Sequence, residues 1–111
     1  MIAWLPAADA TLPATLCHLH LGHNNLRALP TDIGRRCNLL QTLDVNHNSL
    51  NSLPTSLVGW SLLQTLDVSH NSLDSLPASI GQCAALDVLS LGSNVLASLP
   101  AEVGMLRQLT R

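Results

Sequence analysis

One sequence unit recurs four times along this chain. Residues 43–54 read LDVNHNSLNSLP, and residues 66–77, which begin 23 positions later, read LDVSHNSLDSLP. The asparagine of each unit keeps this interval, with steps of 24, 23 and 23 residues between Asn24, Asn48, Asn71 and Asn94. A period of this length is typical of stacked repeats, in which a single unit cannot bury its own apolar side chains. We therefore expect the 111 residues to form one domain held together by contacts between neighbouring repeats.

Leucine occupies fixed positions around each asparagine. The shared pattern is L-x-x-L-x-L-x-x-N-x-L-x-x-L-P-x-x-I. The leucines eight and five positions before the asparagine are Leu16 and Leu19, Leu40 and Leu43, Leu63 and Leu66, and Leu86 and Leu89. In a strand, alternate side chains face opposite sides. The outer residues of LHL, LDV, LDV and LSL are thus expected to point into the core, and the middle residue to point outward.

This pattern resembles the leucine-rich-repeat family over about residues 16–109. The LP-x-x-I-G ending is most similar to the intracellular, Ras-group type of repeat. The resemblance implies an α/β solenoid, with a parallel sheet on the concave side and short helical or 3₁₀ segments on the convex side. The expected division is one domain, 1–111, with a partial repeat or cap at 1–15 and repeats at 16–39, 40–62, 63–85 and 86–108. One position of the repeat holds Cys37, Trp60, Cys83 and Leu106 in turn. Because Trp and Leu are apolar there, we expect Cys37 and Cys83 to be buried as small hydrophobic side chains.

The recurring asparagines have a structural interpretation. Each asparagine stands where the chain is expected to turn away from a strand. Its amide side chain offers both hydrogen-bond donors and acceptors. Such a group can satisfy backbone atoms of the turn, which would cost roughly 1–3 kcal/mol each if they were buried unpaired. We expect a structural ladder of Asn24, Asn48, Asn71 and Asn94.

Composition argues against several classes of function. The net charge is −2 and there is no lysine, so nucleic acid is not an expected partner. No apolar run approaches the roughly 18 residues of a membrane span. The three cysteines are widely spaced and odd in number, and the first residues lack the basic start of a signal peptide, which favours the cytoplasm. No phosphate-binding glycine loop is present, and no cofactor is expected.

Polar residues gather at the outward positions of the repeat. The pattern itself leaves these positions free, so their identities indicate a partner that binds the concave face. The residues assigned to this surface are His18, His20, His23, Asp44, His47, Asp67, His70 and Ser90. The family resemblance implies a protein partner, with a small GTPase or another signalling protein as the candidate class. The open edge of the last strand could also pair with another copy of the chain.

A metal site is the alternative. The segment HLHLGH places His18, His20 and His23 in an H-x-H-x-x-H pattern that resembles part of the zinc signature of metallo-β-lactamase-type hydrolases. Zinc needs three or four nitrogen, sulfur or oxygen ligands, and Asp44 could add one. However, Gly22 stands where that signature carries Asp, and no serine is tied to a His and an Asp by the pattern. We therefore expect a binding module without enzymatic activity.

Overall fold

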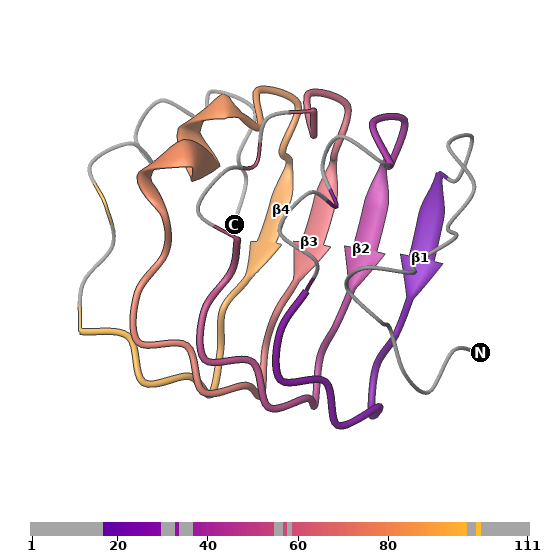
Figure 1. Cartoon of the computed structure of the whole chain (residues 1–111). Coiled ribbons are helices and arrows are strands. Elements are labelled where there is room, and N and C mark those ends of the chain that lie inside the picture. Colours follow the sequence, from indigo (N-terminus) through magenta and orange to yellow (C-terminus); the bar gives the residue numbers. More distant parts are fainter. Residues whose placement is uncertain are drawn as a thin grey trace.

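A computed structural model describes residues 17–29, 33, 37–54, 57, 59–97 and 100. Four short strands follow one another in the chain: β1 (His18–His20), β2 (Thr42–Asp44), β3 (Thr65–Asp67) and β4 (Val88–Ser90). They form one parallel sheet in the order β1-β2-β3-β4. Figure 1 shows the strands side by side in sequence order, one for each turn of the coil. The predicted α/β solenoid with a parallel sheet is confirmed.

The register of the sheet follows the repeat. Leu19 pairs with Leu43, Leu43 with Leu66, and Leu66 with Leu89. The extra residue of the first repeat is taken up between β1 and β2, because the pairing stays in step on both sides of it. An in-register parallel stack places equivalent side chains about 4.8 Å apart along the solenoid. Each repeated side chain therefore meets its own counterpart in the next repeat.

The core is the inside of the coil. In every strand the middle residue is a buried leucine flanked by two outward-facing residues. The residue just after the strand also points inward: Leu21, Val45 and Val68 are buried, while Leu91 is only partly buried. Stacked aliphatic side chains account for nearly all of the core. Burying each aliphatic side chain fully contributes about 1.5–3 kcal/mol to the free energy of folding. Contacts of this kind between neighbouring repeats hold the coil together.

The return segments carry little regular structure. Pro77 ends the extended stretch of the third repeat and is followed by a 3₁₀ helix, η1 (Ala78–Gln82), whose one buried side chain is Ile80. Figure 1 shows η1 on the far side of the coil from the strands. This segment confirms the predicted helical or 3₁₀ turn on the convex side. No helix among the described residues is long and apolar enough to cross a bilayer.

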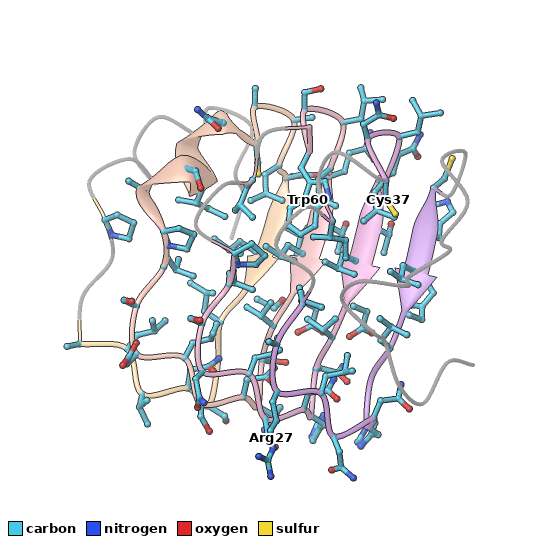
Figure 2. The ribbon with its side chains drawn as sticks, viewed as in Figure 1. Arg27, Cys37 and Trp60 are labelled. Carbon is cyan, nitrogen blue, oxygen red and sulfur yellow. The ribbon has the colours of Figure 1, made fainter. Side chains whose placement is uncertain are left out.

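The slot shared by Cys37, Trp60 and Cys83 is fully buried. Figure 2 labels Cys37 and Trp60 in the upper part of the view, on the opposite edge of the coil from Arg27 at the bottom. Burial raises the pKa of the Cys83 thiol to about 11, so it remains protonated and behaves as a small apolar group. The expectation that this slot is buried is confirmed.

Some expectations fall on residues outside the described part of the chain. These are the terminal segment 1–15 and the end of the last repeat, including Leu106. The division of the chain into repeats at 16–39, 40–62, 63–85 and 86–108 stays a prediction.

Candidate interaction surface

The turn after each strand is organised by its asparagine. Asn71, only 8% exposed, accepts a hydrogen bond from Leu50 N through Oδ1 at 3.0 Å. Its Nδ2 donates to Val45 O and Val68 O at 3.0 Å and to Ser69 O at 3.1 Å. One side chain therefore satisfies polar backbone groups of its own turn and of the preceding one. Leucine at this position could satisfy none of them, which explains the polar residue at the border of an apolar core.

The same contacts repeat along the ladder. Asn48 Oδ1 accepts from Asn24 N and Leu26 N, both at 2.9 Å, and Asn94 Oδ1 accepts from Leu73 N at 3.0 Å. Among the described residues, the buried Nδ2 of Asn24 has no hydrogen-bond partner. The Nδ2 groups of the later asparagines reach a carbonyl of the preceding repeat, so each step of the ladder depends on the repeat before it.

The residue before each asparagine has an unusual backbone. Its φ angle is positive in all four repeats: 60° at His23, 53° at His47, 56° at His70 and 57° at Ser93. This left-handed region is uncommon for residues with a Cβ, although histidine, asparagine and aspartate are enriched there. The turn directs the N–H of this residue to the next repeat, as in the 2.9 Å bond from His70 N to Gly92 O. The backbone therefore restricts which residues suit this position.

Three imidazoles stack on one another at these turns. The ring centroids of His23 and His47 are 4.2 Å apart with an interplanar angle of 13°, and those of His47 and His70 are 4.1 Å apart at 14°. We call His23, His47 and His70 the imidazole stack. Its members are exposed. Desolvation within the stack, followed by the charges of His70 and His23, lowers the pKa of His47, although Asp67 and Asp44 act in the opposite direction.

The two aspartates on the strands are bound to the turns that follow them. Asp44 Oδ1 accepts from Asn46 N at 3.1 Å, and Asp67 Oδ1 accepts from Ser69 N at 3.0 Å and from Ser69 Oγ at 2.6 Å. These bonds hold the start of each turn, in the manner of an Asx turn. The expectation that the repeat leaves these positions free is wrong in this respect, because the turn itself favours a short acceptor side chain there.

The second oxygen of each carboxylate lies near a side chain of another residue on the outer surface. Asp44 Oδ2 lies 3.9 Å from His20 Nδ1, and Asp67 Oδ2 accepts from Asn46 Nδ2 at 3.3 Å. Partial burial works to raise the pKa of Asp67. The hydrogen bonds from Ser69 and Asn46 and the nearby His70 outweigh it, so the pKa of Asp67 lies below its ordinary value. Asp67 is therefore ionised at neutral pH.

Sequence reasoning missed Asn46. Its side chain lies against Gly22, where an added Cβ would come within 2.5 Å of Asn46 Oδ1. The absence of a side chain at Gly22 thus gives the amide room to reach Asp67. The only available signal was the variation of this position among the four repeats, which hold Gly22, Asn46, Ser69 and Gly92.

The outward side of the strands forms one continuous surface, which we call the sheet face. Its residues are His18, His20, Thr42, Asp44, Thr65, Asp67, Val88 and Ser90, all at least partly exposed. Strand pairing places His20, Asp44, Asp67 and Ser90 in one line across the sheet. The imidazole stack lies at the turns that follow this line. The structure therefore arranges seven of the predicted surface residues in two rows, while the eighth, His18, lies outside both and pairs with Thr42 at the start of the strands.

The histidines of HLHLGH do not gather into a metal centre within the described part of the chain. No group of three or more His, Cys, Asp or Glu residues there is arranged to hold an ion. His20 approaches Asp44, whereas His23 stacks on His47.

A four-strand parallel coil with an asparagine at every turn defines a repeat solenoid. The leucine-rich-repeat family model matches residues 14–73 and 38–96, which together make up well over half of the sequence. The chain belongs to the leucine-rich-repeat family.

Solved structures agree with this assignment. A chain in the crystal structure of the BIR3–SERK2 complex from Arabidopsis thaliana is 35% identical, with a TM-score of 0.71 over 79% of the present chain and 49% of its own length. A leucine-rich-repeat protein of Leptospira interrogans is 29% identical, with a TM-score of 0.60 over 86% of this chain and 30% of its own. The present chain thus spans half or less of these relatives. No curated protein matches the sequence.

Proposed function

We propose that this chain is a protein–protein interaction module and that its partner binds across the sheet face. The observation that carries this proposal is the line His20, Asp44, Asp67 and Ser90, one residue from each strand, in register. In each strand the buried leucine directly before the member of this row anchors the strand in the core. Preorganised side chains bind at a lower entropic cost than mobile ones.

The family supports the same function. Leucine-rich-repeat proteins are in general binding modules without enzymatic activity, and one similar chain was crystallised in a complex of two proteins, BIR3 and SERK2. The resemblance of the LP-x-x-I-G ending to the Ras-group repeats supports the finer part of the proposal. The partner is a signalling protein, of which a small GTPase is the first candidate, and the chain acts as a scaffold segment in the cytoplasm.

The sheet face can be tested without disturbing the turns. Thr42 and Thr65 are partly exposed neighbours on β2 and β3. The pair Thr42→Arg and Thr65→Arg adds bulk and charge there and removes none of the hydrogen bonds made by the aspartates. Gln82→Arg with Ala84→Arg, at exposed positions at the end of η1 and just after it, adds the same charge on the return side of the coil, away from the strands. Each protein would be used to capture partners from extracts of the source cells, and each captured protein would be purified and its affinity measured.

The proposal expects a purified partner whose affinity falls at least about tenfold with the sheet-face pair, a loss of roughly 1.4 kcal/mol, and stays unchanged with the return-side pair. Melting temperatures of both variants should match the unmodified chain. A partner that binds the sheet-face variant normally but loses affinity for the return-side variant would contradict the proposal.

Self-association is a second proposed interaction. Within the described sheet, β4 has a neighbour on one side only, and Val95 beyond it is 65% exposed. An unpaired strand edge is a template for pairing with another chain. Light scattering over a concentration series checks this. A single mass at all concentrations would rule it out.

A further inference from the structure

We propose that the sheet face takes a basic segment of its partner, with an arginine or lysine side chain lying between Asp44 and Asp67, and that protonation of the neighbouring imidazoles releases it. This inference rests on the proposed function, since it names the partner chemistry and the regulation of the same surface.

The first observation is a pair of like charges in register. Asp44 and Asp67 are direct partners on adjacent parallel strands, about 4.8 Å apart by the usual strand spacing. Like charges directly opposite each other on neighbouring strands are unfavourable, and a cation between them would relieve the repulsion. The chain has no lysine, and the one arginine in the described part of it is Arg27, which Figure 2 shows pointing away from the coil beyond the turns. A partner can supply such a cation.

The second observation is that the two oxygens of each carboxylate make different contacts. Oδ1 of each aspartate is committed to the turn, through Asn46 N or Ser69 N. Oδ2 has only a distant or long contact: His20 Nδ1 at 3.9 Å from Asp44, and Asn46 Nδ2 at 3.3 Å from Asp67. A guanidinium group presents several N–H donors in a planar fork and can meet two carboxylate oxygens at once. It can therefore bind the two Oδ2 atoms while the turns stay intact.

The third observation is the position of the imidazoles. His20 faces Asp44 from β1, and the imidazole stack follows the strands at the next turns. His47 interacts electrostatically with both aspartates and with both other members of the stack. In the part of the chain that the structure describes, the groups around this site are thus the two carboxylates and the four imidazoles of His20, His23, His47 and His70. Histidine is the side chain whose charge changes near physiological pH.

These positions fix the direction of the pH effect. With neutral imidazoles the two carboxylates leave the surface negative and attract a cation. Acidification favours positive charge on the imidazoles beside the same carboxylates, and the imidazole of His20 already lies 3.9 Å from Asp44 Oδ2, where a cation of the partner would bind. Because proton and ligand binding are reciprocally coupled, each proton displaced on binding weakens the affinity about tenfold per pH unit as the pH falls through the titration range.

The experiment uses a fluorescein-labelled oligoarginine peptide as the probe. A labelled oligoglutamate peptide of equal length is the control with the opposite charge. Anisotropy titrations are run on the whole chain at pH 7.5 and 5.5, at one fixed ionic strength. The first variant is Asp44→Asn with Asp67→Asn, which keeps a side-chain oxygen for each turn. The second is His23→Asn, His47→Asn and His70→Asn, because asparagine also tolerates a positive φ. His18→Gln, on the strand but outside the stack, is the matched control.

We expect oligoarginine to bind at pH 7.5, to weaken at least about tenfold at pH 5.5, and to bind at least about tenfold more weakly to the Asp→Asn variant at pH 7.5. The triple His variant should lose most of the pH effect, and His18→Gln should retain it. Oligoarginine binding that is unaffected by the Asp→Asn pair would overturn the cation site. A pH effect of the same size in the triple variant would overturn the role of the imidazole stack. Tighter binding of oligoarginine to the unmodified chain at pH 5.5 would overturn release by protonation.

The two proposals fail separately. If Thr42→Arg with Thr65→Arg blocks the natural partner while the Asp→Asn pair leaves oligoarginine binding unchanged, the sheet face is an interaction surface for a different chemistry. If neither sheet-face change affects the natural partner, the proposed function itself falls.

Discussion

The side-chain amide of Asn71 donates a hydrogen bond of 3.0 Å to the carbonyl oxygen of Val45, a residue of the preceding repeat. This bond crosses 26 residues of chain and is made where the core meets the turns. The equivalent bonds of Asn48 to Leu21 O and of Asn94 to Val68 O, both at 3.0 Å, show that the connection is built into the repeat. The turns that carry the histidines are therefore held to one another as well as to the core.

Asn71→Leu should destabilise the fold in spite of its greater hydrophobicity. It removes the acceptor for Leu50 N and the donor for Val45 O, Val68 O and Ser69 O. Leaving buried backbone groups unpaired costs about 1–3 kcal/mol. Urea denaturation measures the change, with the exposed Asn51→Leu as the control. An unchanged midpoint for Asn71→Leu would show that the ladder is not a source of stability.

Leu66→Ala and Asp67→Ala test the orientation of β3. Leu66 is completely buried, and its truncation should cost about 2–5 kcal/mol. Asp67 points outward but accepts bonds from Ser69 and Asn46, so Asp67→Ala should cost about 0.5–1.5 kcal/mol and not the negligible amount that an outward position alone suggests. Both values come from urea melts of the same protein. The opposite ranking would contradict the strand orientation.

The stability of the fold should decrease in two steps on acidification. The pKa of His47 is below its ordinary value of 6.5 in the folded state, so the unfolded chain takes up protons more readily and stability is lost as the pH falls through about 6.5 and below. The pKa of Asp67 is also lowered, from 3.8, so a second loss follows as the pH falls below that value. Melting temperatures from pH 8 to pH 3 record both steps.

His47→Asn should reduce the first step and leave the second unchanged, because asparagine suits the φ of 53° and does not titrate. A melting temperature that is constant between pH 7.5 and 5 in the unmodified chain would contradict the lowered pKa of His47.

Cys83 should be unreactive in the folded chain. Its side chain is fully buried, and with a pKa of about 11 roughly one thiol in a thousand is ionised at pH 8. Ellman's reagent at that pH should therefore modify Cys83 only as fast as the chain unfolds, and later than the partly exposed Cys17. Mass spectrometry of the digested protein identifies the labelled positions. Equal labelling of both cysteines without denaturant would show that the slot is open.

Gly22→Ala should disturb the surface more than the fold. The new methyl group would contact Asn46 Oδ1, and the amide would have to turn away from Asp67. Loss of one partly exposed hydrogen bond costs at most about 0.5–1.5 kcal/mol. Proton NMR should show shifts centred on Asn46 and Asp67, with Gly92→Ala as the control, because a Cβ at Gly92 meets no atom within 4 Å. Shifts confined to Gly22 itself would contradict the contact.

The sequence by itself determined the family, the parallel order of the strands and the side of each strand that is buried. The physical reason is repetition: four copies in one register leave only the stacking in which every leucine meets its counterpart, and the alternation of a strand then assigns Leu66 inward and Asp67 outward. The polar asparagine at the border of the core was interpretable for the same reason, because a turn repeated four times needs the same backbone partners four times.

Only the tertiary structure decided what the outward residues do. The positive φ at His47, the stacking of its ring on His70 and the capture of Asp67 Oδ2 by Asn46 all depend on turn geometry and on atoms in different repeats. Sequence spacing places these residues on the same face, but it does not set ring orientation or which carboxylate oxygen is already bonded. These details arise from backbone torsions and distances of a few ångströms, which the pattern of leucines leaves open.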